Sequence, residues 1–293
     1  MLRRPLVMPV LLLISSTQAV AGQVRASELA SVSQTVDGTR LTLEYSRPKA
    51  RGRATAALFG GEVKWNEVWT PGANYATTLE TSKDIQVNQH KVPKGKYSVW
   101  LVVKQDKPWT VVLDPRPKLF HMAHPDSAAN QIRFDVPIGT GPFTETLTWA
   151  FPVVTTKGAT LTMSWGDVQV PFEIEVPPTY SLTMSAEAAR PYEGEYSFAW
   201  GDAPADSVPT TMTLRYEGGS LIGTFTPALW AGADRMVMIP TKTDWFLPGW
   251  IVKGELYDVE RSMGMEFKRK NGKVVSYEVR DEKDALIAKG ARN

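Results

Sequence analysis

Residues 41–74, LTLEYSRPKARGRATAALFGGEVKWNEVWTPGAN, carry the pattern that decides the fold. Leu41, Leu43 and Tyr45 alternate with polar side chains, which is typical of a strand with one buried face. Arg47-Pro48 predicts a turn, and the stretch then gathers arginines, a Gly-Gly pair, two tryptophans and a closing Gly-Ala-Asn. Because bulky, cationic and turn-forming residues are concentrated here, we expect this stretch to frame whatever the protein binds.

The rest of the first half follows the same strand pattern. Short runs with period-2 alternation are separated by turn-forming residues, without helical patterns between them. Residues 115–130 predict a longer loop, and Gly166-Asp167 predicts a two-residue hairpin turn. Strands at this spacing favour an antiparallel β-sandwich or barrel. The predicted strands are Ser31–Val36, Leu41–Ser46, Tyr75–Thr81, Ile85–Val87, Tyr97–Val103, Trp109–Leu113, Gln131–Val136, Thr144–Phe151, Thr160–Trp165 and Val168–Val176.

A change of composition at Val176-Pro-Pro-Thr179 predicts the end of this first domain. A second run of short strands begins near Tyr192, and Asn271-Gly272 is a strong hairpin signal within it. We therefore expect an all-β chain, with an antiparallel β-sandwich followed by a smaller β meander or half-barrel domain. The expected division is a signal peptide at 1–21, a sandwich domain at 22–177, a linker at 178–190 and a small barrel-like domain at 191–293.

The first 21 residues have the pattern of a secretory signal. Arg3 and Arg4 form a basic start, residues 6–14 are an apolar run, and Ala19-Val20-Ala21 is a small-x-small cleavage pattern. The apolar run is shorter than the roughly 20 residues that a spanning helix needs, so an uncleaved membrane anchor is the less favoured alternative. We expect a periplasmic or secreted protein with no membrane span after cleavage.

The composition excludes several classes of partner. The chain has 33 lysines and arginines against 31 aspartates and glutamates, and removal of the leader would balance the two. A balanced charge without a basic block gives no electrostatic footprint for nucleic acid. There is no cysteine, so an exported form has no disulfide and depends on burial for its stability. The partner that we expect is a small molecule or an envelope protein.

A set of short motifs resembles one known family when the motifs are taken in order. They are Tyr45-Ser-Arg-Pro48, Gly52-Arg53, Val68-Trp69, Gly72-Ala73-Asn74, Ala76-Thr77-Thr78, Ser82-Lys83-Asp84, Val87-Asn88, Pro93-x-Gly95-x-Tyr97-Ser98 and Trp109-Thr110-Val111. Over about Ser31 to Val176 the chain resembles the exported bacterial family called domain of unknown function 2911. The resemblance implies fold and export, and it implies no activity. One departure is Thr70-Pro71, which stands where the family usually has an arginine and a threonine.

The C-terminal part resembles a second group loosely. Its Tyr-x-Gly-x-Tyr opening at residues 192–196 and its close at residues 267–274 are similar to small β domains that follow secreted β-lactamase-like hydrolases. This resemblance implies a small β domain.

The central stretch supplies the candidate ligand-binding residues Tyr45, Arg47, Arg53, Trp69 and Asn74. Arginine offers a planar fork of donors for carboxylate or phosphate, and tryptophan faces suit sugars or cations. The structural alternative is that Tyr45 and Trp69 belong to the core while the arginines satisfy acids or loop carbonyls. Structural uses of this kind are commoner than binding sites.

Metal and catalytic chemistry have weaker signals. No metal is expected, because His121, His124 and Asp126 are the only clustered candidates and a catalytic zinc needs three fixed ligands. Without cysteine or a Gly-x-Ser-x-Gly elbow, nucleophilic catalysis is disfavoured. Glycoside cleavage by paired carboxylates stays open, since Glu44, Glu62, Glu67 and Glu80 lie near the central stretch. No glycine-rich phosphate loop leads from a strand into a helix, so no cofactor is expected.

Five aromatic residues of the second domain admit two interpretations. They lie around Pro248-Gly249, and they either line a barrel mouth that holds an apolar ligand or fill the core of the barrel, which is the commoner use. They are Trp230, Trp245, Phe246, Trp250 and Tyr257.

Taken together, the patterns favour a non-catalytic small-molecule or carbohydrate binding module. Two alternatives remain: a hydrolase-like enzyme that uses carboxylates or a metal, and an envelope protein with a structural or protein-interaction role.

Overall fold

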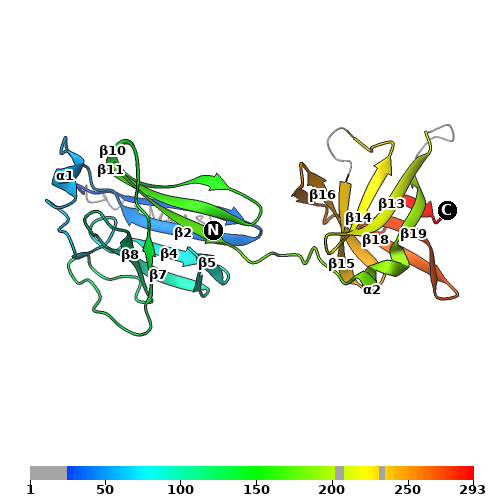
Figure 1. The fold of residues 1–293 in the computed structure, drawn as a ribbon, viewed down its shortest axis with the longest axis horizontal. Helices are drawn as coiled ribbons and strands as arrows, with labels where there is room; N and C mark the ends of the chain where they lie inside the picture. Colours follow the sequence, from blue (N-terminus) through cyan, green and yellow to red (C-terminus); the bar gives the residue numbers. More distant parts are fainter. Residues whose placement is uncertain (1–24, 202–207, 231–234) are drawn as a thin grey trace, which may run out of the picture.

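The computed structural model describes residues 25–201, 208–230 and 235–293, so the predicted leader at 1–21 lies outside the described residues. Figure 1 shows two bodies of antiparallel strands joined by an extended segment. The prediction of an all-β chain is confirmed. Within the described ranges no helix is long and apolar enough to cross a membrane.

The larger sheet of the first body has seven antiparallel strands. Their order is β1-β2-β4-β7-β8-β9, and β3 pairs with β7 off this path. The bounds are β1 (Leu29–Val36), β2 (Thr39–Ser46), β3 (Val68–Trp69), β4 (Thr78–Thr81), β7 (Gly95–Val102), β8 (Trp109–Asp114) and β9 (Ile132–Val136). The Asp37-Gly38 turn sets the first register, with Val36 opposite Thr39, because both turn residues adopt the positive φ that such a tight turn needs.

The smaller sheet has four strands in the order β10-β11-β5-β6. They are β10 (Gly139–Val154), β11 (Gly158–Glu175), β5 (Ile85–Val87) and β6 (His90–Val92). The predicted hairpin at Gly166-Asp167 is wrong, because β11 runs through both residues. Gly166 has a φ of +60° at an irregular point of the β10–β11 pairing. A glycine with positive φ serves a bulge as well as a turn, so the local signal was correct about the backbone and wrong about the chain direction.

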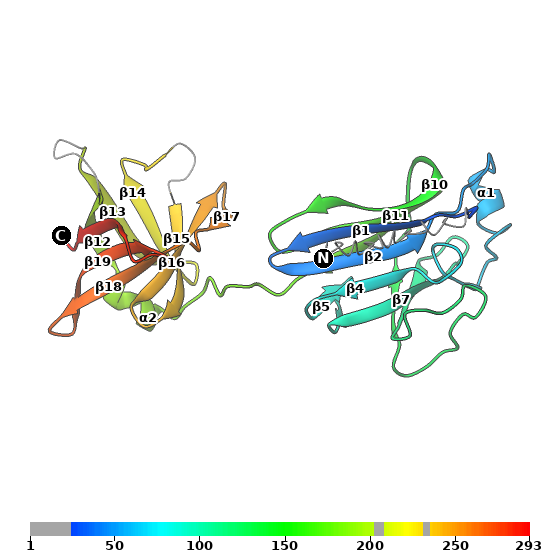
Figure 2. The same cartoon turned by 180° about the vertical axis from the view of Figure 1, so that it is seen from behind.

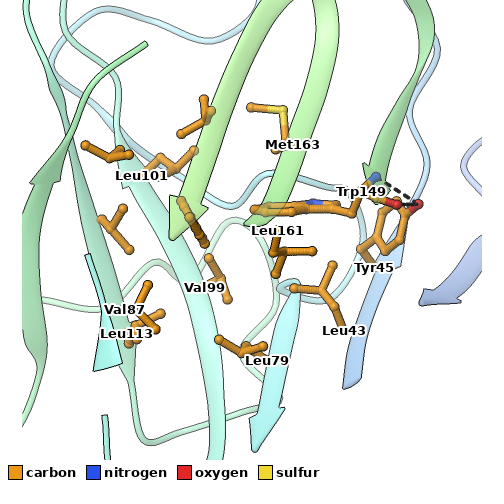
Figure 3. Close-up of a cluster of buried hydrophobic side chains, with 14 of the residues drawn as sticks. Leu43, Tyr45, Leu79, Val87, Val99, Leu101, Leu113, Trp149, Leu161 and Met163 are labelled. Atoms are coloured by element: carbon orange, nitrogen blue, oxygen red, sulfur yellow. Dashed lines mark hydrogen bonds between the residues drawn. The ribbon is translucent and has the colours of Figure 1, made fainter. Parts of the chain in front are cut away.

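The two sheets face each other across one apolar core. Leu43, Leu79 and Val99 come from the larger sheet and meet Trp149 and Leu161 of the smaller one (Figure 3). All five side chains are buried, and burying a leucine side chain contributes about 1.5–3 kcal/mol. The first body is therefore the predicted antiparallel sandwich.

The outer face of the larger sheet is partly covered as well. Trp100 and Val112 point away from the main core and pack with Ala76 and the half-buried Leu119. Leu119 belongs to the loop between β8 and β9, and its carbonyl accepts the backbone N–H of Ala76 at 2.8 Å. Because this loop covers Trp100, β7 is buried on both faces.

The second body is a closed barrel of eight antiparallel strands, more complete than the predicted meander or half-barrel. The ring runs β15-β14-β13-β12-β20-β19-β18-β16 and closes by pairing of β16 with β15, while β17 pairs only with β16. The bounds are β12 (Gly194–Trp200), β13 (Thr210–Glu217), β14 (Ser220–Thr226), β15 (Arg235–Lys242), β16 (Trp245–Val252), β17 (Glu255–Val259), β18 (Met263–Lys270), β19 (Lys273–Asp281) and β20 (Leu286–Ala291).

Two short helices precede the barrel. They are α2 (Ala186–Ala189) and the 3-10 helix η1 (Arg190–Tyr192). The Ser185 hydroxyl caps α2 by accepting the N–H of Ala188 at 3.2 Å, and α2 lies at one end of the barrel in both views (Figures 1 and 2). Ala189 and Tyr192 are buried in the barrel core, so these helices fill that end.

Candidate functional site

The central stretch runs from β2 through α1 (Thr55–Leu58) to β3, and two of its predicted binding residues lie against β10. The hydroxyl of the buried Tyr45 accepts the backbone N–H of Trp149 at 3.0 Å. Arg47 donates from Nε to the carbonyl of Leu147 at 3.2 Å and from Nη2 to the hydroxyl of Thr148 at 2.9 Å. Both side chains therefore tie the larger sheet to the smaller one.

Arg53 folds back on its own loop. Its Nε donates to the carbonyl of Ala50 at 2.7 Å and its Nη2 to that of Lys49 at 3.1 Å. Its Nη1 lies 2.7 Å from Oε2 of Glu62, whose side chain is 60% exposed. An exposed ion pair of this kind contributes about 1 kcal/mol at most, so the main use of the guanidinium is to satisfy loop carbonyls.

Trp69 and Asn74 also make contacts within the chain. The Trp69 ring stacks on Trp165, with centroids 5.9 Å apart and an interplanar angle of 17°. Asn74 has a φ of +63° and donates from Nδ2 to the carbonyl of Ser27 at 3.1 Å and to the hydroxyl of Ser46 at 3.2 Å. The five predicted residues thus have structural partners, and a binding role for them stays a prediction.

Beside the central stretch lies a groove of about 900 Å³. It is formed by α1 and the turn after it, the β7–β8 turn, the connection from β9 to β10, and the irregular point of β11. The lining combines three aromatic and four charged side chains, which are Phe59, Trp65, Trp109, Lys104, Asp106, Lys107 and Asp167. A concave site with apolar walls and a few polar groups is the usual form of a small-molecule site.

The floor of the groove is an aromatic cluster centred on Phe59. The Phe59 ring lies 5.0 Å from Trp109, 5.9 Å from Trp69 and 5.7 Å from Trp165, measured between centroids. The two contacts with Trp69 and Trp165 are edge-to-face, which is the favoured arrangement of aromatic rings. In the part of the chain that the structure describes, the indole N–H of Trp165 is one of two buried side-chain polar atoms without a hydrogen-bond partner.

Two glycines hold the walls in place. Gly60 has a φ of +96°, and a Cβ there would lie 2.5 Å from Nε1 of Trp65, so only glycine lets the indole lie across this backbone. At the irregular point of β11, a Cβ on Gly166 would lie 2.6 Å from the hydroxyl of Thr55. That hydroxyl accepts the backbone N–H of Asp167 at 3.1 Å, which fixes Asp167 at the groove. Bulges often re-aim a side chain in this way.

The charged rim is balanced. Lys104 and Lys107 bring two ammonium groups, and Asp106 and Asp167 bring two carboxylates. Nζ of Lys104 lies 3.3 Å from Oδ1 of Asp135. The pKa of Asp135 is lowered, first by the 2.6 Å hydrogen bond that it accepts from the Thr110 hydroxyl and further by Lys104. A groove with both charges in equal number favours an uncharged polar ligand over an ion.

Sequence reasoning missed most of the groove. Phe59 and Trp65 belong to the central stretch but were not among its candidate residues, and Trp109 and Asp167 were assigned to a strand and a turn. The available signal was the repeated placement of aromatic residues beside turn-forming residues, as at Pro108-Trp109. It could not show that turns far apart in the chain meet in space.

The carboxylates considered for glycoside cleavage do not lie in the groove lining. Glu44 and Glu80 flank Lys96 on the outer face of the larger sheet, at 2.6 and 3.7 Å from its Nζ, and Glu62 pairs with Arg53. The pKa of Lys96 is raised, mainly by its hydrogen bond to Glu44. Three of the four carboxylates are thus engaged in ion pairs on solvated surfaces.

The loop between β8 and β9 holds the weak metal candidates. His121, His124 and Asp126 are exposed, and His121 donates its backbone N–H to the carbonyl of Asn74 at 2.8 Å. Among residues 25–201, 208–230 and 235–293, no three potential ligands are grouped as a metal ion would need.

Asp114, at the start of this loop, is a buried carboxylate with a structural role. Its side chain is 1% exposed and accepts two hydrogen bonds from the Arg116 guanidinium, at 2.9 and 2.8 Å, and one from Nε2 of Gln131 at 2.8 Å. Arg116 first and Gln131 next lower the pKa of Asp114 to about 2. The carboxylate joins the two ends of the loop.

The five aromatic residues of the barrel divide between the two interpretations. Phe246 is in the core, and Trp250 packs half-buried against the same core. Trp230 contacts Trp250 with centroids 4.2 Å apart. The centroid of the Trp245 ring lies 4.3 Å from Nζ of Lys242. Tyr257, on β17, is 76% exposed.

Comparison with known proteins identifies the first body. Residues 27–174 match the family model described as "Protein of unknown function (DUF2911)". This range covers the strands of the sandwich up to Ile174 and all the residues that line the groove. No curated protein and no solved structure matches the chain.

Proposed function

Because the chain belongs to the DUF2911 family of proteins of unknown function, we propose a function from its own groove: a non-catalytic module that binds a small uncharged molecule with polar edges and an apolar face, such as a sugar. The observation that carries the proposal is the shared lining of the groove by three aromatic side chains and a balanced set of four charged ones, which are Phe59, Trp65, Trp109, Lys104, Lys107, Asp106 and Asp167.

The chemistry of the lining supports a sugar-like ligand. A pyranose ring presents C–H groups on its face and hydroxyls at its edge, which matches an indole wall and a rim of donors and acceptors. Trp65 is half-buried in its place over Gly60, so its ring loses little conformational freedom on binding. The volume of about 900 Å³ is within the range of ordinary ligand sites.

Export is part of the same proposal. The leader pattern at 1–21 supports a periplasmic or secreted location, where free sugars and glycans are available. Expression of the full chain in a bacterial host, followed by cell fractionation and intact-mass measurement, tests it. The expected product begins at Gly22 and lies in the periplasmic or culture fraction, whereas an uncleaved cytoplasmic chain would reject export.

The binding test is a thermal-shift and calorimetric screen of the chain from Gly22 onward against monosaccharides, oligosaccharides, organic acids and divalent metals. A ligand at 100 times its Kd adds about 2.7 kcal/mol of stability, which gives a clear shift in Tm. We expect a saccharide to stabilise the protein, and Trp65→Ala to weaken its binding at least tenfold.

A matched control separates the groove from any exposed ring. Tyr75 is an aromatic residue of the same sandwich that is 58% exposed and does not line the groove, so Tyr75→Ala should leave saccharide binding unchanged. Equal losses in both variants, or no saccharide effect at all, would reject the proposal. A stabilising metal whose effect is lost in His121→Ala would support the hydrolase alternative instead.

A further inference from the structure

The barrel is sealed at the end where α2 and η1 enter it. The Tyr192 ring lies 4.9 Å from Phe246 and 5.0 Å from Phe267, between centroids. Its hydroxyl donates to Oδ1 of Asp244 at 2.8 Å, and the same carboxylate pairs with Arg269 at 2.8 Å. An aromatic plug with an ion pair across it closes this end.

The inward-facing side chains become more accessible toward the opposite end. On β12 they alternate as Tyr196, Phe198 and Trp200, and their exposure rises from 0% at Tyr196 through a half-buried Phe198 to 43% at Trp200. β16 shows the same trend from the buried Phe246 to the half-buried Trp250. The barrel is therefore filled at the plugged end and accessible at the other.

The strand pairing also opens at that end. β16 pairs with β18 at two positions only, Trp245 opposite Glu266 and Phe246 opposite Met265, both near the plug. Farther along, from Gly249, β16 pairs with β17 instead. The wall between β16 and β18 is therefore joined by backbone hydrogen bonds at the sealed end. Beyond it β16 stays paired with β15, and its other edge pairs with β17, which lies outside the ring.

The accessible end is lined by a row of aromatic rings in contact, which we call the mouth cluster. Successive centroids are 4.9 Å apart from Trp200 to Phe198, 5.4 Å from Phe198 to Phe225, 6.1 Å from Phe225 to Trp250 and 4.2 Å from Trp250 to Trp230. The row crosses from β12 through β14 to β16, and its two outer members, Trp200 and Trp230, are each 43% exposed. A contiguous patch of partly exposed rings is more informative than a single exposed ring and often marks a binding surface.

We propose that the mouth cluster binds one small apolar molecule, an acyl chain or a planar ring, inserted end-on into the barrel. A barrel of eight strands is wide enough to hold one small ligand where side chains do not fill it. Methionines pack beside these rings: Met212 lies opposite Phe225 and Met236 opposite Trp250 in the strand pairing, and both belong to the barrel core. Methionine side chains adapt to irregular shapes, so these neighbours can yield to a ligand among the rings.

The mouth cluster differs in chemistry from the groove of the sandwich. The groove mixes rings with charged groups, whereas the mouth cluster offers rings alone, and Arg235 at the adjoining end of β15 points outward to Glu217 at 2.5 Å. The two sites should therefore take different ligands, and neither proposal depends on the other.

The test is a titration of the mature chain with N-phenyl-1-naphthylamine, a neutral apolar probe that fluoresces in apolar surroundings. We expect saturable binding with one site per chain and displacement by decanoic acid. Trp200→Ala and Trp230→Ala should each weaken probe binding at least fivefold. Both side chains are well exposed, so the variants should fold, which circular dichroism checks.

Two control variants make the result specific. Tyr257→Ala removes a more exposed ring from β17, and Trp65→Ala removes the indole of the groove, so both should leave probe binding unchanged. The proposal is overturned if binding does not saturate, if Tyr257→Ala weakens it as much as Trp200→Ala, or if the protein instead sediments with phosphatidylcholine vesicles or self-associates through the same tryptophans.

Discussion

Asp114 shows how one buried charge organises a loop. Its carboxylate accepts hydrogen bonds from Arg116, two residues on, and from Gln131, which precedes β9, so it joins both ends of the loop of residues 115–131. This loop in turn covers Trp100 on the outer face of the larger sheet. A buried carboxylate is stabilising only while it is charged and bonded, which makes this region sensitive to acid.

We predict that Asp114 contributes stability that is lost in acid. Its pKa is about 2 in the folded chain and about 3.8 unfolded, so its contribution, on the order of 2 kcal/mol, is complete above pH 4 and disappears as the pH falls toward 2. Asp114→Asn should be less stable by about this amount at pH 7, and its free energy of unfolding should approach that of the wild type near pH 2. Urea unfolding at a series of pH values measures both curves. Asp126→Asn, an exposed change in the same loop, is the control, and a constant difference between Asp114→Asn and wild type at all pH values would contradict the prediction.

For single residues, the sequence identified the structurally important positions more reliably than it predicted the contacts that they make. Tyr45 and Arg47 were recognised by their type and position, yet their partners Trp149 and Leu147 lie about a hundred residues away in the chain. Partners so distant are set by the packing of two sheets, which no local pattern contains. The contacts of Tyr45 and Arg47 in the structure match the alternative that these side chains serve the fold, with Tyr45 in the core and Arg47 bonded to a backbone carbonyl.

Among the elements, α1 depends most on a single backbone feature. This four-residue helix packs on the irregular point of β11, where Gly166 leaves space for Thr55 and Leu58. The same contact fixes Asp167 and therefore one wall of the groove. The sequence marked Gly166-Asp167 as special without showing that a helix lies on it, because a glycine with positive φ looks alike in a bulge and a turn.

We predict that Gly166→Ala destabilises the protein more than backbone strain alone explains. A Cβ there would lie 2.6 Å from Oγ1 of Thr55 and 3.2 Å from Cδ1 of Leu58, so α1 would have to move. Gly52→Ala is the matched control, since Gly52 also has a positive φ, of +72°, with nothing within 4 Å of its Cβ. We expect a loss of about 1 kcal/mol for Gly52→Ala and clearly more for Gly166→Ala, measured by chemical denaturation. Equal losses of stability in the two variants would mean that α1 moves away from the added Cβ at no cost, which would contradict the prediction.

The whole molecule is built from two cores that share no strand. The sheets of the first body end at Glu175, and the barrel begins at Gly194. Thr179 is tied to the sandwich through Asp37, whose Oδ2 accepts its N–H at 2.7 Å, while Tyr180 and Leu182 pack on the outer face of the barrel. The all-β class was predictable because strand alternation and turns are local signals. Closure of the barrel was not, because it depends on the pairing of β12 with β20 across most of the domain.

We predict that the sandwich folds without the barrel. A chain of residues 22–179 keeps every strand of both sheets and the bond between Thr179 and Asp37. It should unfold cooperatively with denaturant, with the β signal of a folded domain in circular dichroism. An unfolded or aggregated product would show that the two bodies depend on each other.

Closure of the barrel has a consequence for how the chain meets its own copies. Each of the eight ring strands has a neighbour on both sides, which leaves few backbone groups free to add a strand from another molecule. The sandwich has free edges. β6 is only three residues long and carries the exposed His90 and Lys91, which discourages such pairing, whereas β1 is eight residues long and begins with the exposed Leu29. Of these two edges, β1 is therefore the more open to strand addition from another molecule and to aggregation by that route.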